Sequence, residues 1–424
     1  MVHPDNACAP SATPLQSLSS VRHWWVVLLC SLVCMLDGYD VLVAPVSVPL
    51  LVDDWGLEAA AFTPALAATV LGMALGAVFL APMGDRYGRK PVLLASFAVV
   101  GVASLGSPLS SSVLELTGFR FVTGLGMGAS ITNALALASE VARPQWRTRI
   151  TICVYSMSAV GSIIGGFLAP AVIEHYAWQG LYYAGGLVPL LLLPLLWQGL
   201  PGSVFPRQVP GAAGRPLAGG VLHNIFQLLA LRYRYTTLLL WLLYFVCLFS
   251  MYVVSSWLPT LMRMYGWPIA ESVRGIMYFS FGGVVGGFVI GWLVDRQHTG
   301  LALYSGFVVA GAGAIGLTVA PPEVLLWMTL IALIGAGVIG VSYAIAALAA
   351  AIYPAELRAG GIGAASAMGR LGATLAPVYG GWMIAAGASA VEIFGSLLLF
   401  AVVGLVAVFL FSRRQWGQQP FLQD

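Results

Sequence analysis

Apolar segments long enough to cross a lipid bilayer recur along almost the whole chain. A membrane-spanning helix needs about 20 mainly apolar residues. Of the 424 residues, 59% are hydrophobic and only 8% are charged, whereas soluble domains contain about 25% charged residues. The sequence therefore predicts an all-α membrane protein embedded in a lipid bilayer. Twelve candidate spans lie near residues 24–51, 63–83, 91–112, 115–140, 150–173, 179–199, 236–261, 274–294, 301–319, 323–351, 359–386 and 389–411.

The longest connection between spans predicts a division into two six-helix halves. Residues 200–235 are polar and rich in Gly and Pro, so we expect a linker there between the halves 23–199 and 236–412. Polar tails are expected at 1–22 and 413–424. The first apolar segment is too long for a signal peptide and lacks a small-residue cleavage site, so we expect it to remain as the first span.

The basic residues predict how the chain is oriented in the membrane. Lys and Arg total 19 and, with both termini inside, fifteen of them fall on the cytoplasmic side, as the positive-inside rule favours. Arg263 and Arg274 fall outside, and Arg120 and Arg370 fall within spans. The sequence therefore predicts a multi-pass protein with cytoplasmic termini. The opposite loops are acidic and carry Asp53, Asp54, Glu58, Glu174 and Glu271.

The two predicted halves match each other at an offset of 210 residues. Residues 72–86 contain G-x-x-x-G followed by Asp-Arg, and residues 282–296 contain the same pattern. Several matches at one offset indicate duplication of a six-span unit. Transporters are commonly built from such repeats, with the substrate site near the membrane midplane. Glycines four residues apart also let helices approach closely.

At the charged positions the two halves carry different residues. The buried acids lie in the first half, and the second half contributes one central arginine. At the offset of 210, Asp37 corresponds to Cys247, Asp40 to Ser250, Arg120 to Leu330, Glu140 to Ala350 and Arg370 to Val160.

Two aspartates interrupt the first predicted span. Asp37 and Asp40 are three residues apart and so share one helix face, and an unpaired carboxylate in hydrocarbon costs several kcal/mol. A low-dielectric site favours the protonated carboxyl group, so either residue could take up a proton on one side and release it on the other. Arg120 could pair with Asp40 and alternate between that partner and a cavity. A permanent structural ion pair is the alternative.

Arg370 is the candidate for binding an anionic substrate. It lies eleven residues into its predicted span, about 16 Å from the inner end at the usual helical rise. A guanidinium near the midplane suits a carboxylate, and a structural pair is the alternative. Further candidate substrate contacts are Tyr39, Tyr252, Trp257 and Asn133, although most membrane aromatics pack or form interfacial belts.

The charged loop between the second and third predicted spans predicts a gate on the cytoplasmic side. Its sequence is G-D-R-Y-G-R-K at residues 84–90, and its charges can reach neighbouring helix ends such as those carrying Glu140 and Arg147. A merely solvated run of charges is the alternative. The candidate gate residues are Gly84, Asp85, Arg86, Gly88, Arg89 and Arg358.

Taken together, these motifs resemble a known family. The loop at 84–90 is similar to the signature loop of the major facilitator superfamily. The D-G-Y-D motif at 37–40 resembles the aromatic acid:proton symporter family within that superfamily. The R-F-V-T-G-L-G-M-G segment from Arg120, W-L-P-T from Trp257 and G-R-L-G from Gly369 agree with it. The resemblance covers nearly the whole chain.

The resemblance implies a major facilitator fold and proton-driven uptake of aromatic carboxylates, such as hydroxybenzoates, across a bacterial inner membrane. The expected partners are protons and a small organic acid, and the expected state is a monomer. The family's important positions correspond to Asp37, Asp40, Asp85, Arg120, Glu140, Arg358 and Arg370, which adds Glu140 to the proton-coupling candidates.

The chain departs from the family pattern at two places. Residues 200–203 are Leu-Pro-Gly-Ser where Pro-Glu-Ser is expected, so one cytoplasmic ion-pair partner is missing. The loop at 295–298 carries a single arginine. These departures leave open an atypical substrate, such as a non-aromatic dicarboxylate from ring cleavage.

Other functions are disfavoured by the residue types present. An exporter on the same scaffold is an alternative, but the fifth predicted span lacks the Gly-Pro pair associated with drug antiporters. The five histidines do not cluster, so no enzyme site is expected. The cysteines lack metal-ligand spacing, and we expect neither a metal nor a cofactor. No basic stripe with interleaved aromatics indicates nucleic-acid binding.

Overall fold

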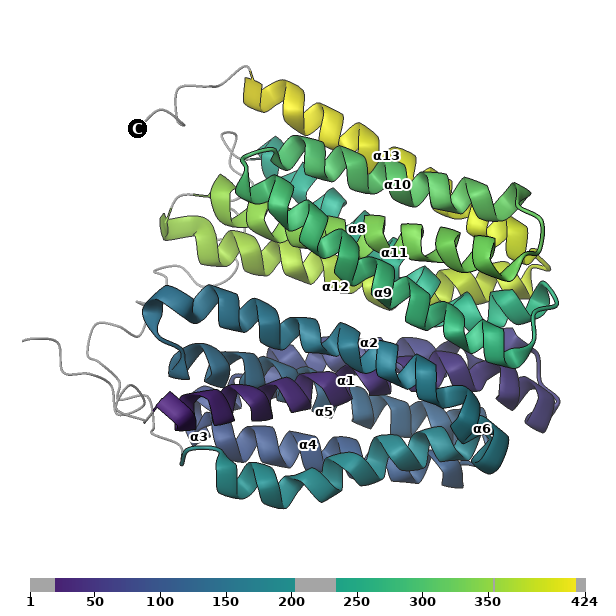
Figure 1. The fold of residues 1–424 in the computed structure, drawn as a ribbon, viewed down its shortest axis with the longest axis horizontal. Helices are drawn as coiled ribbons and strands as arrows, with labels where there is room; N and C mark the ends of the chain where they lie inside the picture. The colour runs from purple at the N-terminus through teal and green to yellow at the C-terminus, as the bar shows by residue number, and fades with distance from the viewer. Residues whose placement is uncertain (1–19, 203–233, 354, 417–424) are drawn as a thin grey trace, which may run out of the picture.

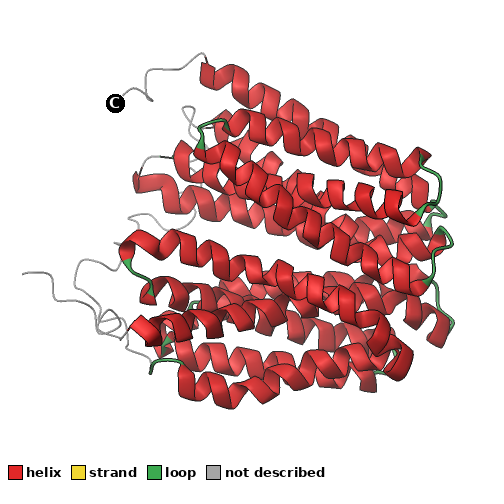
Figure 2. Ribbon diagram, viewed as in Figure 1, coloured by secondary structure: helices red, strands yellow, loops and turns green. Residues whose placement is uncertain are grey.

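The computed structural model describes residues 20–202, 234–353 and 355–416. Within these residues the chain forms helices joined by short loops and contains no strand (Figure 2). The tails and linker predicted at 1–22, 200–235 and 413–424 fall largely outside the described residues, so their bounds stay predictions. The all-α prediction is confirmed.

The first half contains α1 to α6. The helices are α1 Ser20–Trp55, α2 Thr63–Leu75, α3 Met83–Tyr87, α4 Arg89–Gly106, α5 Val113–Val141 and α6 Arg147–Gly199. Short 3-10 turns lie at η1 Ala59–Phe62, η3 Ser107–Leu109 and η4 Pro144–Trp146, and a π-helical turn lies at η2 Gly76–Leu80.

The second half contains α8 to α13. The helices are α8 Arg234–Met264, α9 Ile269–Asp295, α10 Thr299–Val319, α11 Val324–Ile352, α12 Ala355–Ala385 and α13 Ala390–Trp416.

The described helices provide twelve membrane crossings. Ten helices have the length and hydropathy that a crossing needs. Helix α6 counts twice, because its backbone is non-helical at Ala177 (φ 50°, ψ −157°). Helix α12 is not among the ten, since it is rich in glycine and carries Arg370 at its centre. Its 31 residues are nevertheless long enough to span a bilayer, and it packs between α8 and α2.

The two halves form separate bundles that lie side by side (Figure 1). Helix α1 packs mainly on α6 within the first bundle, and α8 packs on α12 within the second. Contacts between the bundles come mainly from α6 with α9, α12 with α2 and α1 with α8. The start of α1 and the end of α13 lie at the same end of the molecule, which is the end predicted to be cytoplasmic.

The glycine pairs of the repeat bring helices into backbone contact in both halves. A Cβ atom added at Gly72 would lie 2.4 Å from the carbonyl oxygen of Phe121, and one at Gly282 would lie 1.9 Å from that of Ala332. Such distances leave no room for a side chain. The predicted role of these glycines in close helix packing is therefore confirmed, and the two halves share the same α2–α5 and α9–α11 contact.

The contacts also correct part of the predicted alignment of the halves. Phe121 and Ala332 are related by 211 residues, one more than Gly72 and Gly282. The same shift relates the contact of Gly38 with Ser158 to that of Leu248 with Gly369. The structural counterparts of Arg120, Glu140 and Arg370 are therefore Ile331, Ala351 and Ala159. These counterparts are also uncharged, so the asymmetry of charge between the halves remains.

Candidate functional site

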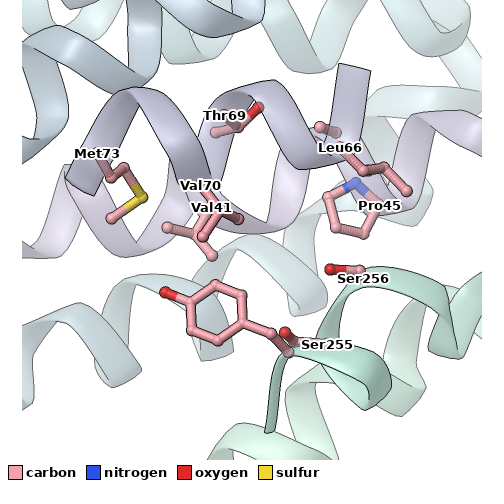
Figure 3. A pocket seen from close by; sticks show the side chains of 10 residues that line it. Val41, Pro45, Leu66, Thr69, Val70, Met73, Ser255 and Ser256 are labelled. Carbon is pink, nitrogen blue, oxygen red and sulfur yellow. The ribbon is translucent and has the colours of Figure 1, made fainter. Parts of the chain in front are cut away.

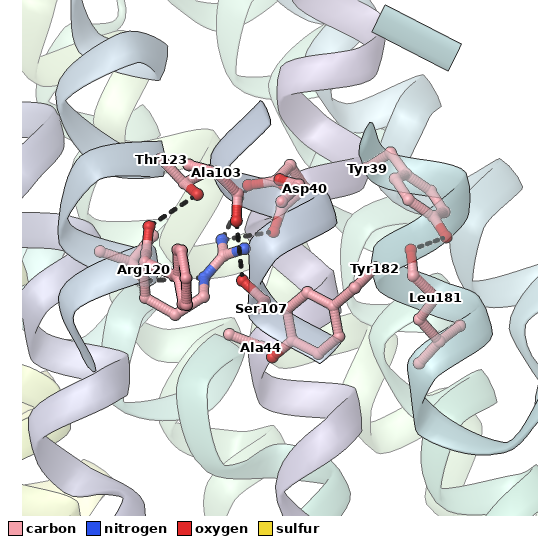
Figure 4. Close-up of polar contacts among 12 residues, drawn as sticks. Tyr39, Asp40, Ala44, Ala103, Ser107, Arg120, Thr123, Leu181 and Tyr182 are labelled. Carbon is pink, nitrogen blue, oxygen red and sulfur yellow. Dashed lines mark hydrogen bonds and ion pairs between the residues drawn. The ribbon is translucent and has the colours of Figure 1, made fainter. Parts of the chain in front are cut away.

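An ion pair between Asp40 of α1 and Arg120 of α5 is buried inside the first half (Figure 4). Arg120 Nη2 donates to Asp40 Oδ2 at 2.7 Å, and the two residues are 0% and 1% exposed. Ser104 Oγ of α4 donates to Asp40 Oδ1 at 3.0 Å. The structure thus contains the ion pair expected from the sequence, and its part in proton coupling stays a prediction.

The guanidinium of Arg120 is surrounded by polar and aromatic groups. Its Nε donates to Thr69 Oγ1 at 3.4 Å, and the ring of Tyr182 lies 5.5 Å from its Cζ. Within the described part of the chain, Arg120 Nη1 has no hydrogen-bond partner. A guanidinium has five N–H donors, so this arginine retains a donor for a further partner while it pairs with Asp40.

Sequence reasoning missed the three residues that surround this ion pair. Ser104, Thr69 and Tyr182 come from α4, α2 and the second segment of α6, which are far apart along the chain. Hydroxyl residues in helices usually bond to a carbonyl of their own helix, so a lone Ser or Thr in an apolar span does not indicate which helix it faces. Only the packing of four helices places these side chains around Arg120.

Asp37 lies one turn before Asp40 and has no salt-bridge partner among the described residues. Its side chain is 5% exposed, and its Oδ1 atom forms no hydrogen bond with a described residue. A buried carboxylate oxygen without a donor is costly, so a proton or a ligand at this position is favoured. The two acids of the D-G-Y-D motif therefore differ, since Asp40 is paired and Asp37 is not.

Asp37, Tyr252 and Arg370 come from α1, α8 and α12, and the two charged residues lie close enough to affect the same tyrosines electrostatically. The charges of Asp37 and Arg370 both act on Tyr252 and on Tyr155 of α6. Tyr155 keeps 47% of its surface exposed. No described carboxylate lies within salt-bridge distance of Arg370, so its charge is free for a ligand.

The other predicted substrate contacts lie elsewhere. The Tyr39 hydroxyl donates to Leu181 O at 2.9 Å, and Trp257 Nε1 donates to Pro377 O at 3.0 Å. Asn133 Nδ2 donates to Ala129 O at 2.9 Å and to Ala81 O at 3.3 Å. Each of these side chains donates a hydrogen bond to a backbone carbonyl, either of its own helix or of another segment. The structure does not bring them together with Arg370, and their contact with substrate stays a prediction.

The predicted gate loop forms a compact charged cluster at the predicted cytoplasmic end. Arg89 donates to Asp85 at 2.6 Å and to Glu140 of α5 at 3.1 Å. Gly88 has φ 96°, a backbone conformation that favours glycine, and this turn separates α3 from α4. Glu140 therefore lies with the gate loop and not with Asp40.

The structure shows contacts for Gly84 and Arg86 of the gate but not for Arg358. A Cβ atom at Gly84 would lie 1.9 Å from Asn133 Oδ1, so the loop packs directly against α5. Arg86 lies over the ring of Tyr87 at 5.3 Å. The side chain of Arg358 lies outside the described residues.

Lys90 connects the gate loop to the end of α6. Its ammonium group donates to the carbonyl oxygens of Trp197 and Leu200, which belong to the last turn of that helix and have no helical donor there. The glutamate expected by resemblance near residues 200–203 is absent from this chain. The lysine therefore makes a direct contact with the helix end where an ion pair was expected.

The halves meet at the predicted outer end. Arg263 of α8 lies 3.7 Å from Asp53 of α1. A Cβ atom at Gly381 of α12 would clash with the side-chain oxygen of Thr63 at the start of α2, and that oxygen is fixed by its bond to Ala60 O at 2.7 Å. In this conformation the outer end is closed by contacts between the two halves.

Gly381→Ala is expected to weaken this outer closure. The added methyl group overlaps Thr63, so the outer-closed state loses stability relative to an outer-open one. We expect at least about tenfold faster labelling of a cysteine placed at Ser256 by an impermeant maleimide, which corresponds to about 1.4 kcal/mol. Gly363→Ala on the same helix is the control, because no described atom lies within 4 Å of its Cβ position. Equal labelling rates in both variants would exclude this role.

Comparisons with known proteins agree with this arrangement. The family model described as Major Facilitator Superfamily matches residues 28–347. A bacterial homologue of the human lysosomal transporter Spinster, in an inward-facing conformation, has a TM-score of 0.73 at 16% identity, covering 95% of this chain and 100% of that chain. The D-xylose-proton symporter has a TM-score of 0.68 at 17% identity, covering 92% and 97%. Both support the predicted fold.

Curated relatives match along nearly their whole length. A gallate transporter of Pseudomonas putida is 34% identical, covering 91% of this chain and 89% of the relative. The 4-hydroxybenzoate transporter PcaK of Pseudomonas aeruginosa is 34% identical, covering 92% and 93%. The 3-(3-hydroxy-phenyl)propionate transporter of Escherichia coli is 32% identical, covering 96% and 99%.

Two bundles of membrane-crossing helices, together with the family model and the named relatives, identify a multi-pass membrane transporter and not an enzyme. The chain belongs to the major facilitator superfamily, and the relatives confirm the resemblance to its aromatic acid:proton symporter family.

Proposed function

We propose that this transporter is a proton-coupled symporter that imports an aromatic carboxylate of the hydroxybenzoate type by alternating access. One observation carries the proposal: Asp37, a buried acid without a described ion-pair partner, and Arg370, an arginine without a described carboxylate partner, come from opposite halves and lie within electrostatic reach of the same tyrosine, Tyr252. The names of the relatives support the substrate class. The distribution of basic residues supports cytoplasmic termini, and the bacterial organisms of the relatives support a location in the bacterial inner membrane.

The chemistry follows from the charges of these two groups. Arg370 binds the substrate carboxylate through its planar, bidentate donor groups. Asp37 takes up a proton, which removes its negative charge from the space that the anion enters. Without that proton, the anion and the Asp37 carboxylate would repel each other. Binding of proton and anion together is therefore favoured, and this coupling is what a symporter requires.

The Asp40–Arg120 ion pair supplies the second part of the mechanism. The pair lies one turn from Asp37 on α1, and the free Nη1 donor of Arg120 offers a second partner. A change of charge at Asp37 alters the electrostatic field at Asp40, because the two carboxyls are neighbours on one helix face. We propose that this pair transmits the protonation of Asp37 to α5, which also carries Glu140 of the gate.

The experiment is uptake of labelled 4-hydroxybenzoate into proteoliposomes with and without an inward proton gradient. The wild type is expected to accumulate substrate only with the gradient. Asp37→Asn imitates the protonated acid, so we expect it to exchange substrate between equal pools but to lose gradient-driven accumulation. Glu58→Gln, an exposed acid in an outer loop, is the matched control.

Each alternative gives a different result in the same assay. Accumulation of a muconate-like dicarboxylate but not of 4-hydroxybenzoate would replace the aromatic substrate with a ring-cleavage product. Expulsion of preloaded substrate against its gradient would indicate export. Full gradient-driven accumulation by Asp37→Asn would exclude that residue as the coupling site.

A further inference from the structure

A small pocket lies between the halves, where α1 and α2 face α8 (Figure 3). The wall from the first half is mainly apolar and includes Pro45, Leu66 and Met73. The wall from the second half carries the hydroxyl groups of Ser255 and Ser256. The pocket has room for a group of about the size of a water molecule, so it suits a hydroxyl group at the edge of a larger ligand and not a whole aromatic ring.

The two serine hydroxyls have no hydrogen-bond partner among the described residues. Ser256 is 4% exposed as a whole residue, and both serines line the pocket, so their hydroxyl groups are available to hydrogen-bond a group that enters it. Some serines of the same half instead bond to their own helix, as Ser305 does to Ala302 O at 3.1 Å. Thr69, on the opposite wall of the pocket, donates to Ala65 O at 3.1 Å. The Thr69 hydroxyl therefore has a protein acceptor, whereas those of Ser255 and Ser256 have none among the described residues.

The spacing along α8 connects these serines to the predicted carboxylate site. Tyr252 precedes Ser255 and Ser256 by three and four residues, so the three side chains share one helix face. Tyr252 is about one helical turn from the two serines, roughly 5.4 Å along the axis. This distance is close to the one between the carboxylate and the opposite hydroxyl group in 4-hydroxybenzoate. Tyr252 itself lies within the electrostatic range of Arg370.

We infer that Ser255 and Ser256 bind the ring hydroxyl group of the substrate and select hydroxylated aromatic acids over unsubstituted ones. The inference rests on the proposed function, because it assigns the part of the substrate opposite the carboxylate. With the carboxylate at Arg370 and the ring passing Tyr252, the hydroxyl reaches the serines. The pocket lies where the halves are in contact, so it widens when they separate at the outer end.

The test is equilibrium binding of labelled 4-hydroxybenzoate and benzoate to the purified full-length protein. The double variant Ser255→Ala/Ser256→Ala is compared with the wild type and with Ser305→Ala. We expect the Kd of 4-hydroxybenzoate to rise about tenfold in the double variant, because hydrogen bonds to its hydroxyl are lost. The Kd of benzoate is expected to change less than about twofold, and Ser305→Ala is expected to change neither.

The outcomes separate this inference from the proposed function. An equal loss of both ligands, or no change for either, would overturn the role of the serines while aromatic acid binding stands. A folded wild type that binds neither acid would overturn both. The single variants Ser255→Ala and Ser256→Ala provide the comparison if the double variant does not fold, and each is expected to weaken only 4-hydroxybenzoate.

Discussion

Asp40→Asn is expected to reduce gradient-driven substrate accumulation to the level of empty liposomes. The change removes the negative charge that Arg120 contacts at 2.7 Å and leaves a buried guanidinium without its counter-ion. Breaking a buried ion pair by removal of one partner costs about 3–5 kcal/mol. Both transport and the thermal stability of the purified protein should therefore fall, and both are measured on the same preparation.

The double variant Asp40→Asn/Arg120→Gln separates a structural ion pair from a functional one. Removing both charges avoids the uncompensated buried charge, so stability should recover relative to Asp40→Asn, as double-mutant cycles show for coupled residues. Accumulation should not recover, because neither residue can then respond to a proton. A double variant that accumulates substrate normally would show that the pair only stabilises the fold.

Gly38→Ala is expected to destabilise the first half strongly. A Cβ atom at Gly38 would overlap the carbonyl oxygen of Ser158 on α6, and one at Gly161 would overlap that of Met35. These two clashes are reciprocal and involve backbone, which cannot move aside as a side chain can. Ser162 Oγ also donates to Gly38 O at 2.7 Å. Overpacking of this kind costs about 1–3 kcal/mol, occasionally more, so the midpoint of thermal aggregation should fall.

Gly118→Ala on α5 is the matched control for this substitution. Nothing lies within 4 Å of its Cβ position, and alanine favours a helix by about 1 kcal/mol over glycine. Its stability should therefore equal or exceed that of the wild type. If Gly38→Ala were as stable as Gly118→Ala, the close contact of α1 with α6 would not be needed for folding. The glycine of the D-G-Y-D motif is thus explained by packing, and its aspartates by charge.

The role of Glu140 is indicated more clearly by its contacts in the structure than by the family resemblance. The family pattern places it among the important positions, and the sequence offers two roles for it, in proton coupling or in the gate. The structure joins it to Arg89 at 3.1 Å, at the opposite end of α5 from Arg120. Glu140 makes its direct contact with the gate loop. Any effect of Glu140 on Asp40 would have to be transmitted along α5 to Arg120.

Asn133 and Trp257 show the limit of assigning substrate contacts from residue type. Both are polar or aromatic residues inside spans, which is the pattern of a binding site as well as of a helix contact. Both are fully buried. Asn133 donates to a carbonyl of its own helix and to Ala81 O in the turn before α3. Trp257 donates to Pro377 O of α12. Sequence periodicity shows that a residue lies on a helix, but the face it presents depends on which helix packs beside it.

The sequence by itself determined the number of spans, the division into halves, the charge asymmetry and the family. These properties depend on hydrophobic length and on local motifs, which are present in the order of the residues. Only the tertiary structure decided that Asp40 is paired while Asp37 is not, that Ser104 and Tyr182 lie against the Asp40–Arg120 pair, and that Ser255 and Ser256 line a pocket between the halves. The reason is physical: a buried charge or hydroxyl is defined by its partners, and those partners come from helices far apart in the chain.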